Sequence, residues 1–413
     1  MKVSFLHYSA PPVVGGVENV MASQAECLSN FGYDVEILCG RGQRWHPRIE
    51  VKSFPLLDSR DTQILEFKKF LDKGQIPSNF EEVVSQIYNW LVEVLADTRL
   101  LIAHNVASQH KNLALTAALY RLISSRQEKL AVILWHHDFA WTASQYKNEL
   151  YPSYPWDLCK KDWKGVTHVA VSDARKQDLV QLTGIAEGKV KVIPAGINQK
   201  SLIGLTDELY QFVAQNHLLS AEPFILMPIR VTRRKNFEMA LRVTASLKRT
   251  FPMVKLVVTG PTGAHNPTNE QYLKELLELR RLLDLENQVF FLAEYFPEGI
   301  SEEWIGSFYR MADVLLLTSK EEGFGIPILE AGLSRLLIFC SDIAPLRALT
   351  DGHAHLFSLH DSPEIVAEKI AEKLNNDLLY AFRAKVRKEF TWEAVYTLKI
   401  APLISEIFQQ NDG

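Results

Sequence analysis

The chain has 413 residues, of which 47% are hydrophobic and 23% are charged, and its formal net charge is −4 at pH 7. This length and composition indicate a globular protein of two or three domains. The slightly acidic balance argues against non-specific nucleic-acid binding as the main activity. The four cysteines form no CxxC pair and show no regular spacing, which argues against a disulfide framework and against a zinc site.

The amino terminus becomes polar within seven residues, too early for a signal peptide. No apolar run approaches the roughly 18 residues that cross a bilayer. We therefore expect a cytoplasmic protein. Peripheral association with the inner face of a membrane is left open.

Short apolar runs alternate with longer amphipathic segments along almost the whole chain. This rhythm is typical of parallel β-sheets that are covered by helices on both faces. The first set of strand-like runs covers residues 3–6, 35–38, 100–103, 131–135, 168–171 and 190–193. The rhythm restarts after Pro223 with residues 224–229, 255–258, 289–292, 314–317 and 336–339.

The restart predicts two α/β domains in tandem, residues 1–200 and residues 201–390. Residues 391–413 carry apolar side chains at helical spacing, and we expect a C-terminal helix that packs back across the domains. Residues 56–97 are rich in helix formers and predict helices inserted into the first domain. Such helices would either line a substrate site or form a surface excursion.

A Gly-Gly pair, Gly15 and Gly16, follows the first predicted strand. At such a strand-to-helix turn, free N–H groups of the helix can meet a phosphate. The sequence is not the G-x-G-x-x-G fingerprint, which lowers the case for NAD. A loop-closing turn is the alternative interpretation.

A second polar group, Trp135-His136-His137-Asp138, follows a buried strand of the first domain. It places imidazoles at the carboxyl edge of the sheet, where open α/β sheets bind ligands. A metal site would need more carboxylate or thiolate partners than this segment shows. A hydrogen-bonding role for His137 is the more economical interpretation, and a structural histidine is the alternative.

In the second domain, Arg230 and Lys235 follow the first predicted strand. Two cations at this place could clamp a diphosphate, Arg230 through its planar guanidinium and Lys235 as a point charge. Because Arg233 and Arg234 lie in the same loop, a solvated basic loop is the alternative.

The run Glu-Glu-Gly-Phe-Gly-Ile-Pro-Ile-Leu-Glu, which starts at residue 321, combines two carboxylates, two glycines and a proline after a predicted strand. Pro327 suits the first position of a helix, so we expect Glu322 in the loop and Glu330 in the opening turn of that helix. Gly323 and Gly325 let the backbone approach a ligand closely, and the helix start favours negative charge. The run predicts a site for an anionic ligand rich in hydroxyl groups.

Together these motifs resemble the retaining glycosyltransferases of family 4, whose GT-B architecture consists of two facing Rossmann-like domains. The resemblance covers most of the chain, and its markers occur in the expected order. They are Gly15-Gly16-Val17-Glu18, His137-Asp138, Val171-Ser172-Asp173, Ile193-Pro-Ala-Gly-Ile-Asn198, Arg230 with Lys235, Val258-Thr-Gly-Pro261, Tyr309-Arg-Met-Ala-Asp313 and the E-x7-E pair Glu322 and Glu330.

The resemblance implies that Arg230 and Lys235 hold a diphosphate, while Glu322 binds hydroxyls of the transferred sugar and Glu330 binds the ribose. It implies that His137 binds a sugar hydroxyl near the reacting carbon. The donor would also be bound by Gly15, Gly16, Gly323 and the backbone N–H groups of Phe324, Gly325 and Ile326.

The resemblance also implies a nucleotide-sugar donor, with UDP-glucose first and GDP-mannose second. A saccharide or a lipid-linked saccharide would be the acceptor, in polysaccharide or glycoconjugate biosynthesis. No cofactor and no metal are expected, because cationic side chains and helix amino termini would stabilise the departing diphosphate.

The chain departs from the family at a few positions. Arg335 and Leu337 stand where the family usually has glycine and proline, and Asn198 and Ala195 replace an aspartate and an asparagine. The first two lie behind the binding loop, so we expect them to affect local backbone geometry more than the reaction.

Three other functions compete with a glycosyltransferase. A sugar-nucleotide 2-epimerase would use the same two-domain architecture and would consume donor without an acceptor. A catalytically weak nucleotide-sugar-binding protein would bind donor without transfer. An NAD-dependent oxidoreductase comes last, because neither half shows the fingerprint turn.

Overall fold

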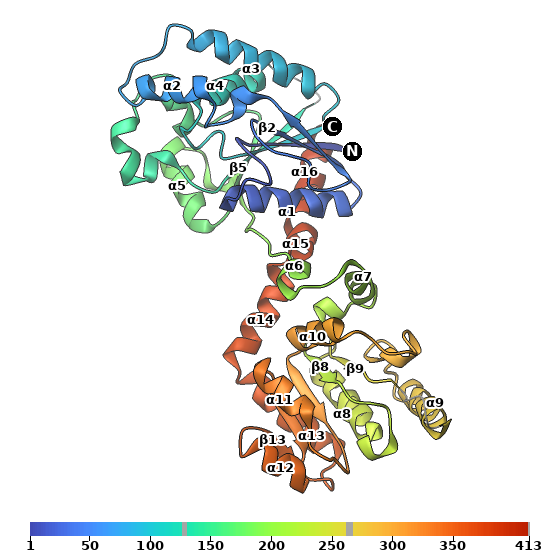
Figure 1. Ribbon diagram of the computed structural model, residues 1–413. Helices are drawn as coiled ribbons and strands as arrows, with labels where there is room; N and C mark the ends of the chain where they lie inside the picture. The colour runs from blue at the N-terminus through green and yellow to red at the C-terminus, as the bar shows by residue number, and fades with distance from the viewer. Residues whose placement is uncertain (126–129, 262–266, 412–413) are drawn as a thin grey trace. The chain divides into compact units, whose positions relative to one another are not determined.

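The computed structural model describes residues 1–125, 130–261 and 267–411. The chain forms two compact units, the first made of residues 1–197 with 389–413 and the second of residues 198–388 (Figure 1). It therefore leaves the first unit after Ile197 and returns to it after Lys388, whereas the sequence pattern places these divisions after residues 200 and 390.

The first unit alternates strands and helices. Its strands are β1 (Lys2–Leu6), β2 (Asp34–Cys39), β3 (Ile49–Ser53), β4 (Leu100–His104), β5 (Ala131–His136), β6 (Thr167–Ala170) and β7 (Val190–Val192). Its helices are α1 (Gly16–Asn30), α2 (Thr62–Leu71), α3 (Phe80–Val94), α4 (Leu113–Ser124), α5 (Asp173–Thr183), α15 (Trp392–Val395) and α16 (Ala401–Asn411).

The second unit repeats this alternation. Its strands are β8 (Phe224–Met227), β9 (Lys255–Val258), β10 (Val289–Phe291), β11 (Val314–Leu317), β12 (Leu337–Ser341) and β13 (His355–Phe357). Its helices are α6 (Gln199–Ile203), α7 (Asp207–Gln215), α8 (Phe237–Thr250), α9 (Pro267–Leu282), α10 (Glu302–Met311), α11 (Ile326–Leu333), α12 (Ala344–Thr350), α13 (Pro363–Asn375) and α14 (Leu378–Glu389). None of the helices in the described part of the chain has both the length and the apolar character of a membrane-crossing segment.

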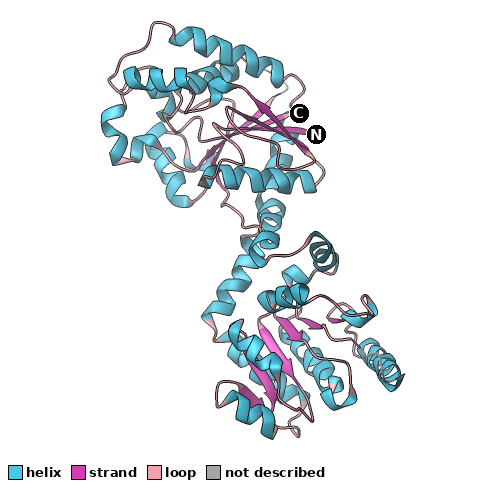
Figure 2. Cartoon of the chain, viewed as in Figure 1, coloured by secondary structure: helices cyan, strands magenta, loops and turns pink. Residues whose placement is uncertain are grey.

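Each unit has one parallel sheet with helices on its faces (Figure 2). The strand order is β3-β2-β1-β4-β5-β6-β7 in the first unit and β10-β9-β8-β11-β12-β13 in the second. Numbered within each unit, both sheets follow the order 3-2-1-4-5-6 that is typical of Rossmann folds. The predicted class, two Rossmann-like α/β domains, is confirmed.

The central strands of the first unit are buried on both faces. Alternate strand residues enter two different cores, because successive side chains of a strand point to opposite faces. Leu6 and Leu101 pack with α2, α3 and α4, whereas Phe5 and Ile102 pack with α1, α15 and α16. Figure 2 shows helices on both sides of this sheet. The near-continuous apolar strand runs in the sequence follow from this double burial.

Two strands are absent from the sequence prediction. β3 is an edge strand whose sequence IEVKS is only partly buried, and β13 is a three-residue edge strand. Edge strands need fewer apolar residues because one side has no neighbouring strand, so their signal in the sequence is weak.

The C-terminal segment, residues 389–411, packs into the first unit. α15, a π turn over Tyr396–Ile400 and α16 form one continuous helical segment there, and Figure 1 shows this red segment beside the blue α1. Trp392 is buried, and a Cβ atom on Gly196 would lie 2.6 Å from its ring. The glycine of the marker that ends the first domain is therefore required by this close packing.

Arg335, which replaces the usual glycine, has a positive φ of 60°. It follows α11, and the N–H of Leu336 bonds the carbonyl of Ala331 at 3.0 Å, which closes the helix in a Schellman motif. A left-handed conformation costs a non-glycine residue about 1–2 kcal/mol, so the arginine is accommodated at some expense. Leu337 gains a bond that proline lacks, because its N–H donates to the carbonyl of Asp313 at 3.2 Å.

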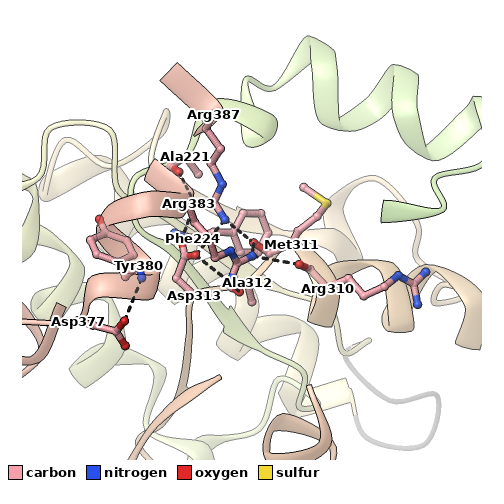
Figure 3. Close-up of polar contacts among 10 residues, drawn as sticks. All are labelled: Ala221, Phe224, Arg310, Met311, Ala312, Asp313, Asp377, Tyr380, Arg383 and Arg387. Atoms are coloured by element: carbon pink, nitrogen blue, oxygen red, sulfur yellow. Dashed lines mark hydrogen bonds and ion pairs between the residues drawn. The ribbon is translucent and has the colours of Figure 1, made fainter. Parts of the chain in front are cut away.

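A buried ion cluster centres on Asp313, just before β11 (Figure 3). Its two carboxylate oxygens accept hydrogen bonds from Arg387 at 2.7 and 2.9 Å, and one of them lies 3.2 Å from Arg383. The backbone N–H of Phe224, at the start of β8, adds a bond of 2.9 Å. The cluster thus joins α14 to two neighbouring strands.

The same two arginines satisfy backbone carbonyls where α10 ends (Figure 3). Arg383 donates to the carbonyls of Arg310 and Ala312, and Arg387 donates to that of Met311. The last carbonyls of a helix have no partner within the helix, so these contacts replace water. The aspartate of the Tyr309-Arg-Met-Ala-Asp313 marker therefore has a structural role.

We expect Asp313→Ala to lower the free energy of unfolding of the second unit by about 2–4 kcal/mol, because two partly buried guanidinium groups lose their counter-charge. Urea titration with hydrogen exchange of the second unit measures this change. The matched control is Asp342→Ala, which removes an exposed ion pair with Arg347 and should leave stability nearly unchanged. Equal effects of the two substitutions would contradict the structural role.

Candidate active site

Both sheets have a topological switch point beside their first strand. β1 lies between β2 and β4, and β8 lies between β9 and β11. The chain leaves these neighbouring strands in opposite directions, which opens a crevice at their carboxyl ends where ligands bind in such folds. The candidate residues from the sequence follow β1, β5, β8 and β11.

In the second unit, Lys235 and Glu322 meet at this crevice. Lys235 ends a 3₁₀ turn after β8, and Glu322 lies in the loop after β11. Their side chains form an ion pair in which only 8% and 9% of the side-chain surfaces are exposed. The hydroxyl of Ser319 donates a hydrogen bond of 2.8 Å to the same carboxylate oxygen of Glu322.

Hydrogen bonds hold the two loops against each other. The buried hydroxyl of Thr318 lies 2.9 Å from the carbonyl oxygens of both Lys235 and Asn236. The N–H of Lys320 donates to the carbonyl of Arg234 at 2.8 Å. The position of Lys235 relative to Glu322 is therefore fixed by backbone contacts as well as by charge.

Arg230 lies apart from this ion pair. Its side chain is exposed and has no hydrogen-bond or ion-pair partner among the described residues. A Cβ atom on Gly260 would lie 2.3 Å from the carbonyl of Ile229, and the N–H of Val231 donates to Pro261 at 3.2 Å. The glycine of the Val258-Thr-Gly-Pro261 marker thus lets its backbone contact the loop after β8, which carries Arg230.

The loop after β11 ends in an uncapped helix start. Gly325 precedes α11 with φ of 102°, and a Cβ atom there would lie 2.8 Å from Leu346. No side chain of the described residues caps this end, and the flanking Phe324 and Ile326 are 57% and 59% exposed. Gly323 borders open space. The N–H of Ile326 is thus available to an anion, whereas Pro327 has no N–H and that of Ile328 donates to the carbonyl of Gly325 at 2.9 Å.

Glu330 lies one residue further along the helix than expected. α11 begins at Ile326, so Pro327 is its second residue and Glu330 its fifth, beyond the opening turn. The earlier start is possible because glycine adopts the left-handed conformation before the helix. The exposed carboxylate of Glu330 accepts a hydrogen bond of 2.5 Å from Tyr309. Burial and this bond raise the pKa of Tyr309 above its usual value.

In the first unit, His137 follows β5 and has a second histidine as its partner. Its Nε2 lies 3.0 Å from Nδ1 of the buried His104, and its backbone N–H donates to Asn105 Oδ1 at 2.8 Å. Burial, together with His7, lowers the pKa of His137 to about 4. His137 is therefore neutral near pH 7.

The remaining nitrogen of His104 fixes the proton positions. Its Nε2 is buried without a partner in the described part of the chain. An unpaired N–H costs more than an unpaired lone pair, so we assign the proton of His104 to Nδ1, which donates to His137. The ring of His137 then carries its own proton on Nδ1 and can donate it to a ligand.

The neighbouring His136 points the other way. Its Nε2 lies 3.1 Å from Nδ1 of His168, and both rings are buried. Adjacent residues at a strand end face opposite sides of the sheet, so His136 and His137 do not converge on one ligand.

Gly15 and Gly16 open α1 as expected. A Cβ atom on Gly15 would lie 2.1 Å from the carboxylate of Glu18, whereas Gly16 has open space around it. Glu18 folds back over the helix start, accepts a hydrogen bond of 2.7 Å from Ser9 and lies 3.7 Å from the ring of His7. The two glycines and His137 thus belong to strand ends of one sheet edge.

A cluster of side chains of the kinds that bind metal ions lies elsewhere in the first unit. Asp72, His110 and Glu149 bring their ligand atoms within 4.8 Å of one another. Lys68 lies 2.6 Å from Asp72 and 2.8 Å from Glu149, so its ammonium group already supplies the positive charge. The group is an ion-pair network.

The inserted helix α2 and the loop that leads from it to α3 border a hollow of about 780 Å³. Phe70 and Ile76 are about half exposed on its lining. The predicted insertion of helices at residues 56–97 agrees with the structure, and whether they contact a substrate stays a prediction.

Some site residues carry no motif. Ser319, Thr318 and His104 are ordinary polar residues in the sequence, and only the fold shows that they hold Glu322, Lys235 and His137. One signal was present, since Ser319 precedes Glu322 by three residues, a spacing that suits a local side-chain bond.

The fold and the crevice residues define a class of enzyme, the glycosyltransferases. The family model "Glycosyltransferase Family 4" matches residues 14–200, and "Glycosyl transferases group 1" matches residues 211–390. One model thus describes each half of the chain. The chain belongs to the family 4 glycosyltransferases.

Similar proteins carry transferase names. Mannosylglucosylglycerate synthase of Petrotoga mobilis is 25% identical over 378 residues, which cover 84% of this chain and 85% of that protein. Alpha-1,3/1,6-mannosyltransferase ALG2 of Kluyveromyces lactis is 25% identical over 378 residues, covering 85% and 71%. Among solved structures, a glycosyltransferase from Rickettsia africae is 18% identical, with coverage of 98% and 99% and a TM-score of 0.36.

A double-mutant cycle tests the buried pair. We expect Lys235→Met and Glu322→Gln each to lower the free energy of unfolding by about 3 kcal/mol, because each leaves one charge without its partner. The double variant should lose less than the sum, with a coupling of about 1–3 kcal/mol. Urea denaturation measures all four proteins. Additive effects would show that the pair does not stabilise the site.

The buried histidines predict a dependence of stability on pH. Burial lowers the pKa of His7, His104, His136, His137 and His168 in the folded unit. Below about pH 6.5 the unfolded chain binds protons that the folded unit does not, so stability falls as pH decreases towards 4. Each such histidine contributes about 1.4 kcal/mol per pH unit.

Urea titrations between pH 7.5 and 4.5 check this expectation by tryptophan fluorescence, since every tryptophan except Trp304 lies in the first unit. His137→Gln should reduce the slope. A stability that is constant from pH 7 to pH 5 would contradict it.

Proposed function

We propose that this enzyme transfers a hexose from a nucleoside diphosphate hexose to an acceptor hydroxyl, with retention at the anomeric carbon. The observation that carries the proposal is the contact between Lys235 and Glu322 at the switch point beside the uncapped start of α11. A cation, a carboxylate and free N–H groups lie next to each other there. Diphosphate and sugar hydroxyls are likewise adjacent in a nucleotide sugar.

In this proposal Lys235 and Arg230 hold the diphosphate, and Glu322 accepts hydrogen bonds from sugar hydroxyls. Glu330, oriented by Tyr309, binds the ribose. The N–H groups of Phe324, Gly325 and Ile326 contribute to binding of the phosphate and sugar.

Residues of the first unit have their own proposed roles. The turn at Gly15 and Gly16 contacts the donor phosphate or the reacting sugar. The neutral ring of His137 donates its Nδ1 proton to a sugar hydroxyl near the anomeric carbon. His104 holds that ring in the required tautomer.

The proposed reaction forms one carbon–oxygen bond, breaks another and transfers one proton. The acceptor hydroxyl oxygen attacks the anomeric carbon on the face from which the diphosphate leaves, and the bond between that carbon and the diphosphate oxygen breaks. The leaving phosphate oxygen takes the proton of the acceptor. Positive charge from Arg230, Lys235 and the start of α11 stabilises the diphosphate, so we propose that no metal is required.

For the transferred sugar we propose mannose first and glucose second. Three relatives that match more than four fifths of this chain have names that include a mannosyl group. The family resemblance favours UDP-glucose, which is therefore the second donor to test.

Thermal-shift measurements with GDP-mannose, UDP-glucose and ADP-glucose test the donor. A bound donor at one hundred times its Kd stabilises the protein by about 2.7 kcal/mol, so selective stabilisation identifies base and sugar together. Stabilisation by none of a full set of nucleotide sugars would overturn the proposal.

Transfer assays test the role of Glu322. We expect Glu322→Ala to lower turnover by one to two orders of magnitude or more, because charged hydrogen bonds of about 1.5–3 kcal/mol each are lost. Glu321→Ala is the matched control, since the neighbouring side chain is exposed, and it should retain activity. Wild-type transfer by Glu322→Ala would contradict the assignment.

A further inference from the structure

A pocket of about 580 Å³ opens at one edge of the first unit. It is lined by segments that follow β1, β2, β3, β4 and β5, and Gly15 and Gly16 form part of its wall. Its volume lies in the range of small-molecule sites. Four cationic side chains line it, contributed by four different segments: Arg41, Arg60, Lys68 and Lys111.

Two of these cations already have partners. Arg41 Nε lies 3.5 Å from Asp58. Lys68 lies within 2.8 Å of both Asp72 and Glu149. Their charges are therefore compensated within the first unit.

The other two cations, Arg60 and Lys111, are exposed, and neither side chain has a hydrogen-bond or ion-pair partner among the described residues. The backbone of Arg60 is nonetheless fixed, because its N–H donates to Asp58 Oδ1 at 3.0 Å. A Cβ atom on Gly40 would lie 1.9 Å from the backbone of Asp58, so the glycine lets this loop approach the end of β2. Burial acts to raise the pKa of Glu18, but the hydrogen bond from Ser9 outweighs it together with smaller effects that include the charge of Lys111, so the pKa is lowered.

The two carboxylates of the lining, Glu18 and Asp138, have a different character. The charge of Glu18 is offset by the start of α1 and by the hydrogen bond from Ser9. Asp138 follows His137 at the end of β5 and is exposed. Carboxylate oxygens accept hydrogen bonds, so this part of the lining suits hydroxyl groups.

We propose that this pocket binds the acceptor, and that the acceptor carries an anionic group, a carboxylate or a phosphate, which Arg60 and Lys111 bind. The inference rests on the proposed function, because it takes the ligand that lies beside the donor-binding turn at Gly15 and Gly16 to be the acceptor. Arginine binds either anion through two parallel N–H bonds, and lysine adds a point charge. A neutral saccharide would leave both cations without a counter-charge. Hydroxyl groups of the same molecule face Glu18 and Asp138.

Acceptor selectivity tests the inference. Glucose, glucuronate and glucose 6-phosphate form a matched set that is neutral, carboxylated and phosphorylated. With the identified donor, we expect a KM at least tenfold lower for one or both anionic sugars than for glucose. The two anionic sugars distinguish a carboxylate acceptor from a phosphate acceptor. An equal KM for all three sugars would overturn the inference.

Single substitutions test whether Arg60 and Lys111 cause the preference for anionic sugars. Arg60→Gln and Lys111→Met should each reduce the preference for an anionic sugar, measured as the KM for glucose divided by the KM for the anionic sugar, about tenfold or more. This is the loss expected for a charged hydrogen bond. Lys189→Met removes an exposed lysine of the same unit outside the pocket and is the matched control. Raised salt should weaken the anionic preference of the wild type. A ratio unchanged in both pocket variants would overturn the assignment.

Binding in the absence of donor separates this inference from the proposed function. Calorimetry with glucuronate and glucose 6-phosphate should show binding that Arg60→Gln weakens. If nucleotide sugars are bound and used while neither anionic sugar binds or reacts, the inference fails and the proposed function stands. If no nucleotide sugar binds but an anionic sugar does so through Arg60, the proposed function fails and the anion site stands.

Discussion

The structure depends on one topological constraint that is repeated in both units. The first strand of each sheet lies between the second and the fourth, so the chain leaves neighbouring strands in opposite directions at their carboxyl ends. Packing cannot fill the crevice that results, and polar side chains collect there. Lys235 and Glu322 meet at the switch point of the second unit, while Gly16 and the partners of His137 lie along the corresponding edge of the first.

Much of the polar architecture holds the side chains of this crevice in place. Thr318 bonds the backbone of Lys235, Ser319 bonds the side chain of Glu322, and His104 orients His137. The Asp313 cluster lies before β11, at the opposite end of the strand from Glu322, and joins α14 to the sheet. Family markers therefore divide into two kinds, those at carboxyl strand ends that can meet a substrate and those that let backbone segments touch, such as Gly196 and Gly260.

The two units present different chemistry at equivalent places. In the second unit a buried ion pair and an uncapped helix start suit a diphosphate joined to a sugar. In the first unit Glu18 covers the helix start, and His137 is neutral. The unpaired cations Arg60 and Lys111 lie on the loops after β3 and β4.

The sequence pattern was sufficient to predict the α/β class, the two Rossmann-like domains and the residues at the carboxyl strand ends, because strands buried on both faces leave long apolar runs and motifs follow them directly. It also predicted that Glu322 and Lys235 lie in loops that follow strands, and it indicated the family. It missed the edge strands β3 and β13, whose half-buried residues give little pattern, and it placed Glu330 one residue too early in its helix. Which polar residues form hydrogen bonds with each other could be seen only in the tertiary structure. Ser319 with Glu322, His104 with His137 and the unpaired state of Arg60 depend on side chains brought together from different strand ends, and local sequence does not encode such distances.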